Sequence, residues 1–216
     1  MLLTSTINME ALLEHFPKLT EQQIAQFEQL GPLYREWNDK INVISRKDID
    51  QLYPHHILHA LAIPQVVKFR TGAKILDLGT GGGLPGIPLA ILYPNVQFTL
   101  IDGTRKKIKV VQEIIDAIGL DNAEAKHIRA EELKDRFDFV VCRAVASLDK
   151  LVPWTQRLLK REERHALPNG LLTLKGGDLK SEIKALGKGH YVELFPITDY
   201  FKMDYYIEKY VVYVQG

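Results

Sequence analysis

The chain has 216 residues, of which 46% are hydrophobic and 25% charged, the composition of a folded globular protein with a full core. Its 28 basic and 27 acidic side chains give a formal net charge of +1, so charge alone provides no argument for nucleic-acid binding. Cys142 is the only cysteine, which excludes an internal disulfide. No apolar run approaches the ~18 residues of a membrane helix, and no signal peptide is recognisable, so we expect a cytoplasmic protein.

The first third of the chain carries the spacing of amphipathic helices, with apolar residues recurring at three- and four-residue steps. A capping box predicts that one helix begins at Thr20, because Gln23 stands at the position that completes it. Gly31-Pro32 interrupts the same pattern and is expected to kink or split that helix. We expect a further helix over residues 47–63, ending before the proline that follows.

After residue 70 the pattern changes to alternating strands and helices. Strand patterns occur at AKILDL, VQFTLID, NAEAKHI, FDFVVCR, GLLTLKG, YVELFPI and YYIEKYVVYV, and the last alternates like an antiparallel partner. Repeated strand–helix units predict an α/β fold whose mainly parallel sheet is covered on both faces. We therefore divide the chain into an N-terminal helical extension, residues 1–70, and one α/β domain, residues 71–216.

The stretch from Gly79 to Gly86 holds five glycines between a buried strand and a helix. Such a turn lets ligand atoms approach the main chain and forms a seat for an anion or a nucleotide. A P-loop is excluded because no Lys-Ser or Lys-Thr pair follows these glycines. A dinucleotide site remains an alternative, because the residues from Gly81 to Gly86 match GxGxxG.

Asp77 favours a third ligand, S-adenosylmethionine, over a nicotinamide dinucleotide. This acid ends the strand that leads to Gly79, Gly81 and Gly83. Its carboxylate is suited to the ammonium group of S-adenosylmethionine, which hydride carriers lack, while the glycines leave room for the amino-acid part. Asp102 closes the next strand and can accept both hydroxyls of a ribose. That second acid supports a nucleoside ligand without choosing between the two classes.

Longer segments resemble one family. The run DLGTGGGLPGIPLAILYP, followed by FTLID, IRAEEL, FDFVVCRAVASL and LKGG, is similar to the bacterial small-subunit ribosomal RNA methyltransferase G family, also called GidB. The resemblance extends upstream to WNDKINVIS and HHILHAL and so covers nearly the whole chain. It implies a Rossmann-like, seven-stranded S-adenosylmethionine fold. It also implies methylation of guanine N7 in 16S ribosomal RNA, within the small ribosomal subunit or an assembly intermediate, with no metal and no membrane.

The resemblance further assigns residues to the site, position by position. The cofactor contacts that it implies are the methionine side at Gly79 and Leu84, the ribose at Asp102, Gly103 and Thr104, and the adenine at Ala130 and Glu131. Arg143 is expected at a strand end near both cofactor and substrate, and Lys175 of LKGG is expected to point toward the site. The family often has HILDS where this chain has His59 and Ala60, so any role of that Asp is in doubt here.

The residue types agree with methylation of a ring nitrogen. Guanine N7 has a free lone pair at neutral pH, so the reaction needs alignment and no general base. Cys142-Arg143-Ala144-Val145 stands where amino-group methylases commonly carry an Asn/Asp-Pro-Pro-aromatic motif. We expect Cys142 to be a core residue. We expect Arg143 to orient a phosphate, a carboxylate or guanine O6, with an ion pair to Glu131 as an equally weighted alternative.

Other polar clusters are open to more than one interpretation. His55, His56 and His59 are expected to pack on a helix surface or between segments rather than to bind a metal. Candidate RNA contacts, each more commonly a solvated helix surface, are Arg105-Lys106-Lys107 and the set Arg157, Lys160, Arg161 and Arg164. Two rival functions remain: an NAD(P)-linked oxidoreductase that uses GxGxxG, and a non-catalytic RNA- or ribosome-binding module with a nucleoside pocket.

Overall fold

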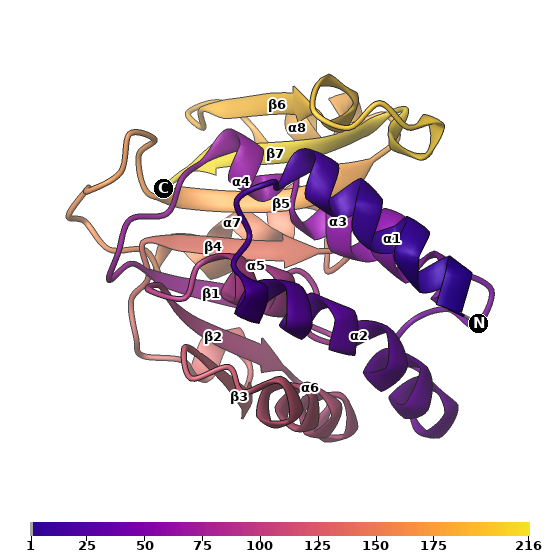
Figure 1. Ribbon diagram of the computed structural model, residues 1–216. Coiled ribbons are helices and arrows are strands. Elements are labelled where there is room, and N and C mark those ends of the chain that lie inside the picture. The colour runs from indigo at the N-terminus through magenta and orange to yellow at the C-terminus, as the bar shows by residue number, and fades with distance from the viewer. Residues whose placement is uncertain (1) are drawn as a thin grey trace.

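A seven-stranded sheet forms the centre of the molecule, and the computed structural model describes residues 2–216 (Figure 1). The strands lie in the order β3 (Ala123–His127), β2 (Gln97–Asp102), β1 (Lys74–Leu78), β4 (Phe139–Arg143), β5 (Gly170–Gly176), β7 (Lys209–Gln215) and β6 (Val192–Pro196). The first five are parallel, and β7 is antiparallel to both of its neighbours. All seven predicted strands and the Rossmann-like α/β class are thus confirmed.

Alternate residues of the central strands enter two separate hydrophobic clusters, one on each face of the sheet. In β4, Phe139 and Val141 join the cluster under α5 (Gly86–Leu92) and α6 (Arg105–Ile118). Val140 and Cys142 join the other cluster, under α7 (Leu148–Gln156) and α8 (Lys180–Leu186). Because both faces are covered, these strands read as continuous apolar runs. Cys142 is a buried core residue, as predicted.

The N-terminal helices pack on the face that α5 and α6 cover (Figure 1). They are α1 (Leu2–His15) and α2 (Glu21–Lys40), and the predicted capping box of Thr20 and Gln23 is present at the start of α2. The predicted split of α2 is wrong, because the helix runs through Pro32 without a break. The hydroxyl of Tyr53 donates to Phe27 O at 2.7 Å and lies 3.4 Å from Glu28 O, the carbonyl that Pro32 leaves without its helical donor.

The single helix predicted over residues 47–63 is also wrong. The segment consists of a 3-10 turn (Ile49–Gln51), a π-helix (Leu52–Ile57), α3 (Leu58–Ala60) and α4 (Ile63–Val66). Pro64 lies inside the first turn of α4, where its missing N–H costs nothing. The apolar spacing therefore indicates the helical character of this segment correctly, but it carries no sign of the wider π turn or of the restart at α4.

The extension and the sheet share one hydrophobic cluster. Phe27, Leu30 and Tyr34 of α2 belong to the same buried set as Ile75 of β1 and Phe98 of β2. Two glutamines of α2 also bind the ends of neighbouring helices: Gln23 Nε2 donates to Ile91 O at 2.8 Å, and Gln26 Nε2 donates to Ile118 O at 3.0 Å. A boundary near residue 70 stays a prediction. None of the helices formed by residues 2–216 is both long and apolar enough to cross a membrane.

Candidate functional site

A cavity of about 160 Å³ lies where the parallel strands β1, β2 and β4 end. It is lined by Leu78, Gly79, Ile101, Asp102, Gly103, Ile128, Arg129, Ala130, Glu131, Val145 and Trp154. The chain order reverses between β1 and β4, and ligands of open α/β sheets bind at such a switch point, beyond the carboxyl ends of the strands. Five of the predicted cofactor residues therefore meet in one cavity: Gly79, Asp102, Gly103, Ala130 and Glu131.

Asp77 holds the glycine loop from beneath. Its Oδ2 accepts hydrogen bonds from Thr80 Oγ1 at 2.5 Å and from the main-chain N–H of Gly86 at 2.8 Å. The side chain is completely buried, and burial raises the pKa of Asp77 to about 7 against the opposing effect of those two hydrogen bonds. Its Oδ1 has no partner among the described residues. Contact between Asp77 and a ligand ammonium stays a prediction, which only this Oδ1 could fulfil.

Gly79 and Gly81 have backbone conformations that other residues rarely adopt, with φ of +67° and +60°. A Cβ on Gly79 would also lie 2.7 Å from Val145 Cγ2, whereas the position beside Gly81 is open. Gly83 serves internal packing, because a Cβ there would lie 2.4 Å from Ile87 Cδ1. The side chain of Leu84 is buried in the core cluster rather than in the cavity, so its expected contact with a ligand stays a prediction.

Helix α2 supports the glycine loop from the other side. The buried hydroxyl of Tyr34 donates to Gly82 O at 2.7 Å, and a Cβ on Gly82 would lie 2.8 Å from Val43 Cβ. Asn38 ends the same helix, since its Oδ1 accepts from the N–H groups of Val43 and Ile44 at 2.8 and 2.9 Å. Asn38 thus stabilises the turn at the end of α2. The hydrogen bond between Tyr34 and Gly82 could not be predicted from local sequence patterns, because 48 positions separate the two residues.

Asp102 joins the loop to the end of β2. Its Oδ2 accepts from Gly81 N at 3.1 Å and its Oδ1 from Thr104 N at 2.8 Å. A carboxylate oxygen has two lone pairs, so each oxygen can still accept a hydroxyl from the cavity that Asp102 lines. The geometry fits the predicted ribose contact. It also gives Thr104 a main-chain role outside the cavity.

The far wall of the cavity is held by Arg157, a member of the second set of candidate RNA contacts. The guanidinium of Arg157 donates to the carbonyls of Ala130 and Leu133, at 3.1 Å for Leu133. This contact fixes the turn that carries Ala130 and Glu131, and it removes Arg157 from the candidate RNA contacts. Trp154, one turn earlier on α7, lines the cavity directly, although no motif in the sequence singles it out.

Arg143 ends β4 as a partly buried cation that does not line the cavity, so its expected contact with the cofactor stays a prediction. The predicted alternative of an ion pair with Glu131 is wrong, since no carboxylate among the described side chains lies within ion-pair distance of Arg143. Burial lowers the pKa of its guanidinium, while the nearby Tyr34, Tyr205 and Asp77 act in the opposite direction. The next residue, Ala144, is exposed with φ of +54°, a strained conformation for a residue with a Cβ.

Lys175 acts on the loop that follows Arg143. Its ammonium donates to Ala146 O at 2.8 Å and pairs with Glu182 Oε2 at 2.8 Å. Glu182 Oε2 also accepts from Leu148 N at 3.1 Å, at the start of α7. Lys175 does not line the cavity, so a direct role there stays a prediction and the observed contacts are those of a positioning residue.

A polar cluster lies near Arg143 on the side of the N-terminal segment. Asp48 accepts from His55 Nδ1 at 2.7 Å and from His56 Nε2 at 2.5 Å, and the ring of Tyr205 stacks on His55 with 3.6 Å between centroids. Burial, with Arg143 second, lowers the pKa of His56 to about 4 and that of His59 to about 3. Both imidazoles are therefore neutral at pH 7. Among residues 2–216, no group of three or more His, Cys, Asp or Glu side chains is placed to hold a metal.

Buried His59 gives a pH-dependent prediction. The unfolded chain takes up a proton near pH 6.5 and the folded chain only near pH 3, so neutral His59 contributes fully above pH 6.5 and its contribution is lost as the pH falls. His59→Phe keeps ring packing against Tyr206. We expect the free energy of unfolding of the variant to gain on that of the wild type by about 1.4 kcal/mol per pH unit between about pH 6.5 and 4.5. Urea unfolding checks this, and a constant difference would contradict it.

The candidate RNA contacts separate into free and structural cations. Arg105 and Lys106 are exposed at the start of α6, directly after the Asp102 that lines the cavity. Lys160 is instead paired with buried Asp138 at 2.7 Å, and Arg164 lies beside Glu162 at 3.2 Å. The first set therefore remains the better candidate for RNA contact.

The sheet disfavours the dinucleotide alternative. In dinucleotide-binding domains the second half of the sheet continues in parallel, in the order 3-2-1-4-5-6. Here an antiparallel strand, β7, is inserted between β5 and β6. Within the literal GxGxxG match, Gly83 and Gly86 face Ile87 and Asp77 rather than open space.

Comparisons with known proteins agree with this geometry. A profile of the family described as GidB, rRNA small subunit methyltransferase G, matches residues 23–195. The chain is 52% identical over 206 residues to a protein of Flavobacterium psychrophilum named ribosomal RNA small subunit methyltransferase G, covering 95% of this chain and 97% of that one. It is 49% identical over 214 residues to the protein of that name from Porphyromonas gingivalis, covering 98% and 96%.

Solved structures show the same fold at low sequence identity. A precorrin-6y C5,15-methyltransferase from Geobacter metallireducens superposes with a TM-score of 0.55 at 14% identity, covering 82% of this chain and 92% of that one. An S-adenosylmethionine-dependent methyltransferase from Aquifex aeolicus gives 0.53 at 14% identity, covering 73% and 89%. With the profile match and relatives of about half-identical sequence, the chain belongs to the ribosomal RNA small subunit methyltransferase G family.

Proposed function

We propose that the chain transfers a methyl group from S-adenosylmethionine to N7 of a guanine in the 16S RNA of the small ribosomal subunit. The observation that carries the proposal is the cavity beside the glycine loop, in a chain about half-identical to relatives named for ribosomal RNA methylation. S-adenosylmethionine is the cofactor, and the protein is an enzyme of the methyltransferase class. We place the reaction in the bacterial cytoplasm, where ribosomal subunits assemble, and infer an intact or assembling subunit as the substrate.

The residues of the site fit this cofactor. Asp102 has lone pairs for the ribose hydroxyls, and Gly79 leaves the main chain bare where the cavity meets β1. Ala130 and Trp154 give the wall an apolar surface suited to adenine. Asp77 Oδ1 is a buried carboxylate oxygen without a partner among the described residues, and such an oxygen can accept a hydrogen bond from the cofactor's ammonium group. When bound, the cofactor supplies an electrophilic methyl group on a sulfonium.

The chain's own task is then to hold the guanine rather than to move a proton. N7 keeps its lone pair at neutral pH, so alignment and exclusion of water are what the site must provide. We assign Arg143 to the guanine, because it ends β4 on the side of the sheet where the cavity lies, and its partly buried guanidinium pairs with no carboxylate of the described residues. A planar fork of donors is suited to guanine O6 or to the neighbouring phosphate. Lys175 positions the intervening loop through Ala146.

Methyl transfer from tritiated S-adenosylmethionine to 30S subunits tests the proposal, with subunits taken from a strain that lacks the endogenous enzyme. We expect label in one nucleotide of 16S RNA, and mass mapping of that nucleotide to give 7-methylguanosine. Label at another guanine atom or another base would contradict the assignment. Absence of transfer by a chain that binds S-adenosylhomocysteine would instead favour a non-catalytic ribosome-binding module. Thermal stabilisation by NAD and not by S-adenosylhomocysteine would favour the oxidoreductase.

A further inference from the structure

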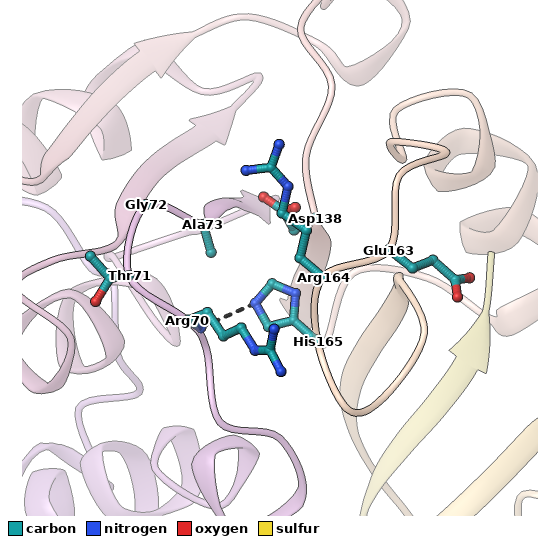
Figure 2. Close-up of a pocket in the computed structure, with 8 residues that line it drawn as sticks. All are labelled: Arg70, Thr71, Gly72, Ala73, Asp138, Glu163, Arg164 and His165. Carbon is teal, nitrogen blue, oxygen red and sulfur yellow. Dashed lines mark hydrogen bonds between the residues drawn. The ribbon is translucent and has the colours of Figure 1, made fainter.

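A second cavity, of about 300 Å³, lies at the other end of the sheet, and Figure 2 shows the residues that line it. Its walls include Arg70, Thr71 and Ala73 before β1, Asp138 before β4, and Arg164 and His165 in the loop before β5. Because β1 and β4 are parallel, the residues that precede them lie together at the amino-terminal ends of the strands. The first cavity lies at the carboxyl ends. The two cavities have no lining residue in common.

Asp138, which lines this cavity, has one unused acceptor. Its side chain is 1% exposed, and its Oδ2 accepts from Lys74 N and from Lys160 Nζ, each at 2.7 Å. Its Oδ1 is buried and has no hydrogen-bond partner among the described residues. A buried carboxylate oxygen without a donor is costly, so this atom favours a ligand N–H. The ammonium of Lys160 already balances the carboxylate charge, which gives a free cation little advantage.

His165, in the wall of the same cavity, has one unused donor. The main-chain N–H of Arg70 donates to His165 Nε2 at 3.1 Å, so Nε2 carries the lone pair and Nδ1 of the neutral ring carries the proton. Burial lowers the pKa of His165, which keeps the ring neutral at pH 7. Nδ1 is buried without a partner among the described residues. The ring is fixed edge-on against Phe139, with 5.0 Å between centroids at 80°.

We propose that this cavity binds a nucleobase through an edge that sets an N–H donor beside an acceptor. Asp138 Oδ1 accepts from the ligand N–H, and His165 Nδ1 donates to the ligand acceptor. The volume of about 300 Å³ is at the lower end of the range for small-molecule sites and admits a base with its ribose. Arg70 and Arg164 line the same cavity, with their guanidinium groups on opposite sides of His165 (Figure 2), and the guanidinium of Arg70 suits a phosphate attached to that ribose.

Uridine 5′-monophosphate is the probe, because its base has a single N–H, at N3, between two carbonyls. We expect saturable binding to the full-length chain by calorimetry, and no binding of 3-methyluridine 5′-monophosphate, in which a methyl group replaces that N–H. A short oligouridylate distinguishes the source. Tighter binding of the oligomer assigns the site to an RNA strand, and equal binding per site assigns it to a free nucleotide.

Three variants locate the binding. Asp138→Asn can keep an oxygen for Lys74 N while an NH₂ replaces Oδ1, and His165→Phe keeps the ring but removes the donor. Ala73→Leu places a larger side chain in the wall of the cavity. It replaces Asp138→Asn in the test if circular dichroism shows that Asp138→Asn does not fold. Each is expected to weaken binding of the probe by about tenfold or more, with unchanged affinity for S-adenosylhomocysteine. Absence of saturable binding, equal binding of the methylated probe, or wild-type affinity in the folded variants would overturn the proposal.

Discussion

Replacing Gly79 by valine is expected to abolish cofactor binding, with the dissociation constant for S-adenosylhomocysteine raised by about 100-fold or more. Two effects act together. A β-branched residue at φ of +67° is strained, and its Cβ would lie 2.7 Å from Val145 Cγ2. Relief of that contact must move either the glycine loop or the loop after β4, and both border the cavity. Isothermal titration calorimetry gives the dissociation constant.

Gly119→Val is the matched control for this variant. Gly119 has φ of +62° and ends α6, and a Cβ at this position would have no neighbouring atom within 4 Å. The substitution therefore carries a similar backbone cost away from the cavity. We expect a loss of about 1–2 kcal/mol in the free energy of unfolding and unchanged binding of S-adenosylhomocysteine. Wild-type affinity in folded Gly79→Val would remove the glycine loop from the cofactor site.

Replacing Arg143 by alanine is expected to lower turnover by about 10- to 100-fold at saturating cofactor, with a much smaller change in affinity for S-adenosylhomocysteine. The guanidinium pairs with no carboxylate among the described side chains, so its hydrogen-bonding capacity is available to the substrate. The guanidinium is only partly exposed, and Tyr34 and Tyr205 lie near it. Methyl transfer to 30S subunits gives the rate, and calorimetry gives the cofactor affinity.

Arg143→Lys separates charge from shape. Lysine restores a point charge but not the planar fork of donors, so we expect only partial recovery of turnover. Full recovery would show that the charge alone suffices. If Arg143→Ala weakens cofactor binding as much as it lowers turnover, the residue belongs to the cofactor site and not to the guanine.

The sequence predicted those features that depend on neighbouring residues. The seven strands follow from local apolar patterns, and the position of the glycine loop follows from Asp77 and the glycines after it. The sequence did not show in which direction a side chain points, nor which residues far apart in the chain lie in contact. A strand-end acid can point toward a ligand or under a loop, and Asp77 Oδ2 binds Gly86 N beneath the loop. Arg157 was predicted to be a solvated or RNA-binding cation, because a sequence does not distinguish an arginine on the surface from one that donates to main-chain carbonyls.

The contact of Tyr34 with Gly82 makes the N-terminal extension part of the cofactor site without contributing a lining residue. Loop order and the docking of α2 therefore belong to one cooperative unit of the native state. We therefore expect cofactor binding at the loop to slow local opening of α2, although no residue of that helix lines the cavity. Removing the extension would take away this support for the loop and would also expose the hydrophobic cluster that Phe27, Leu30 and Tyr34 share with β1 and β2.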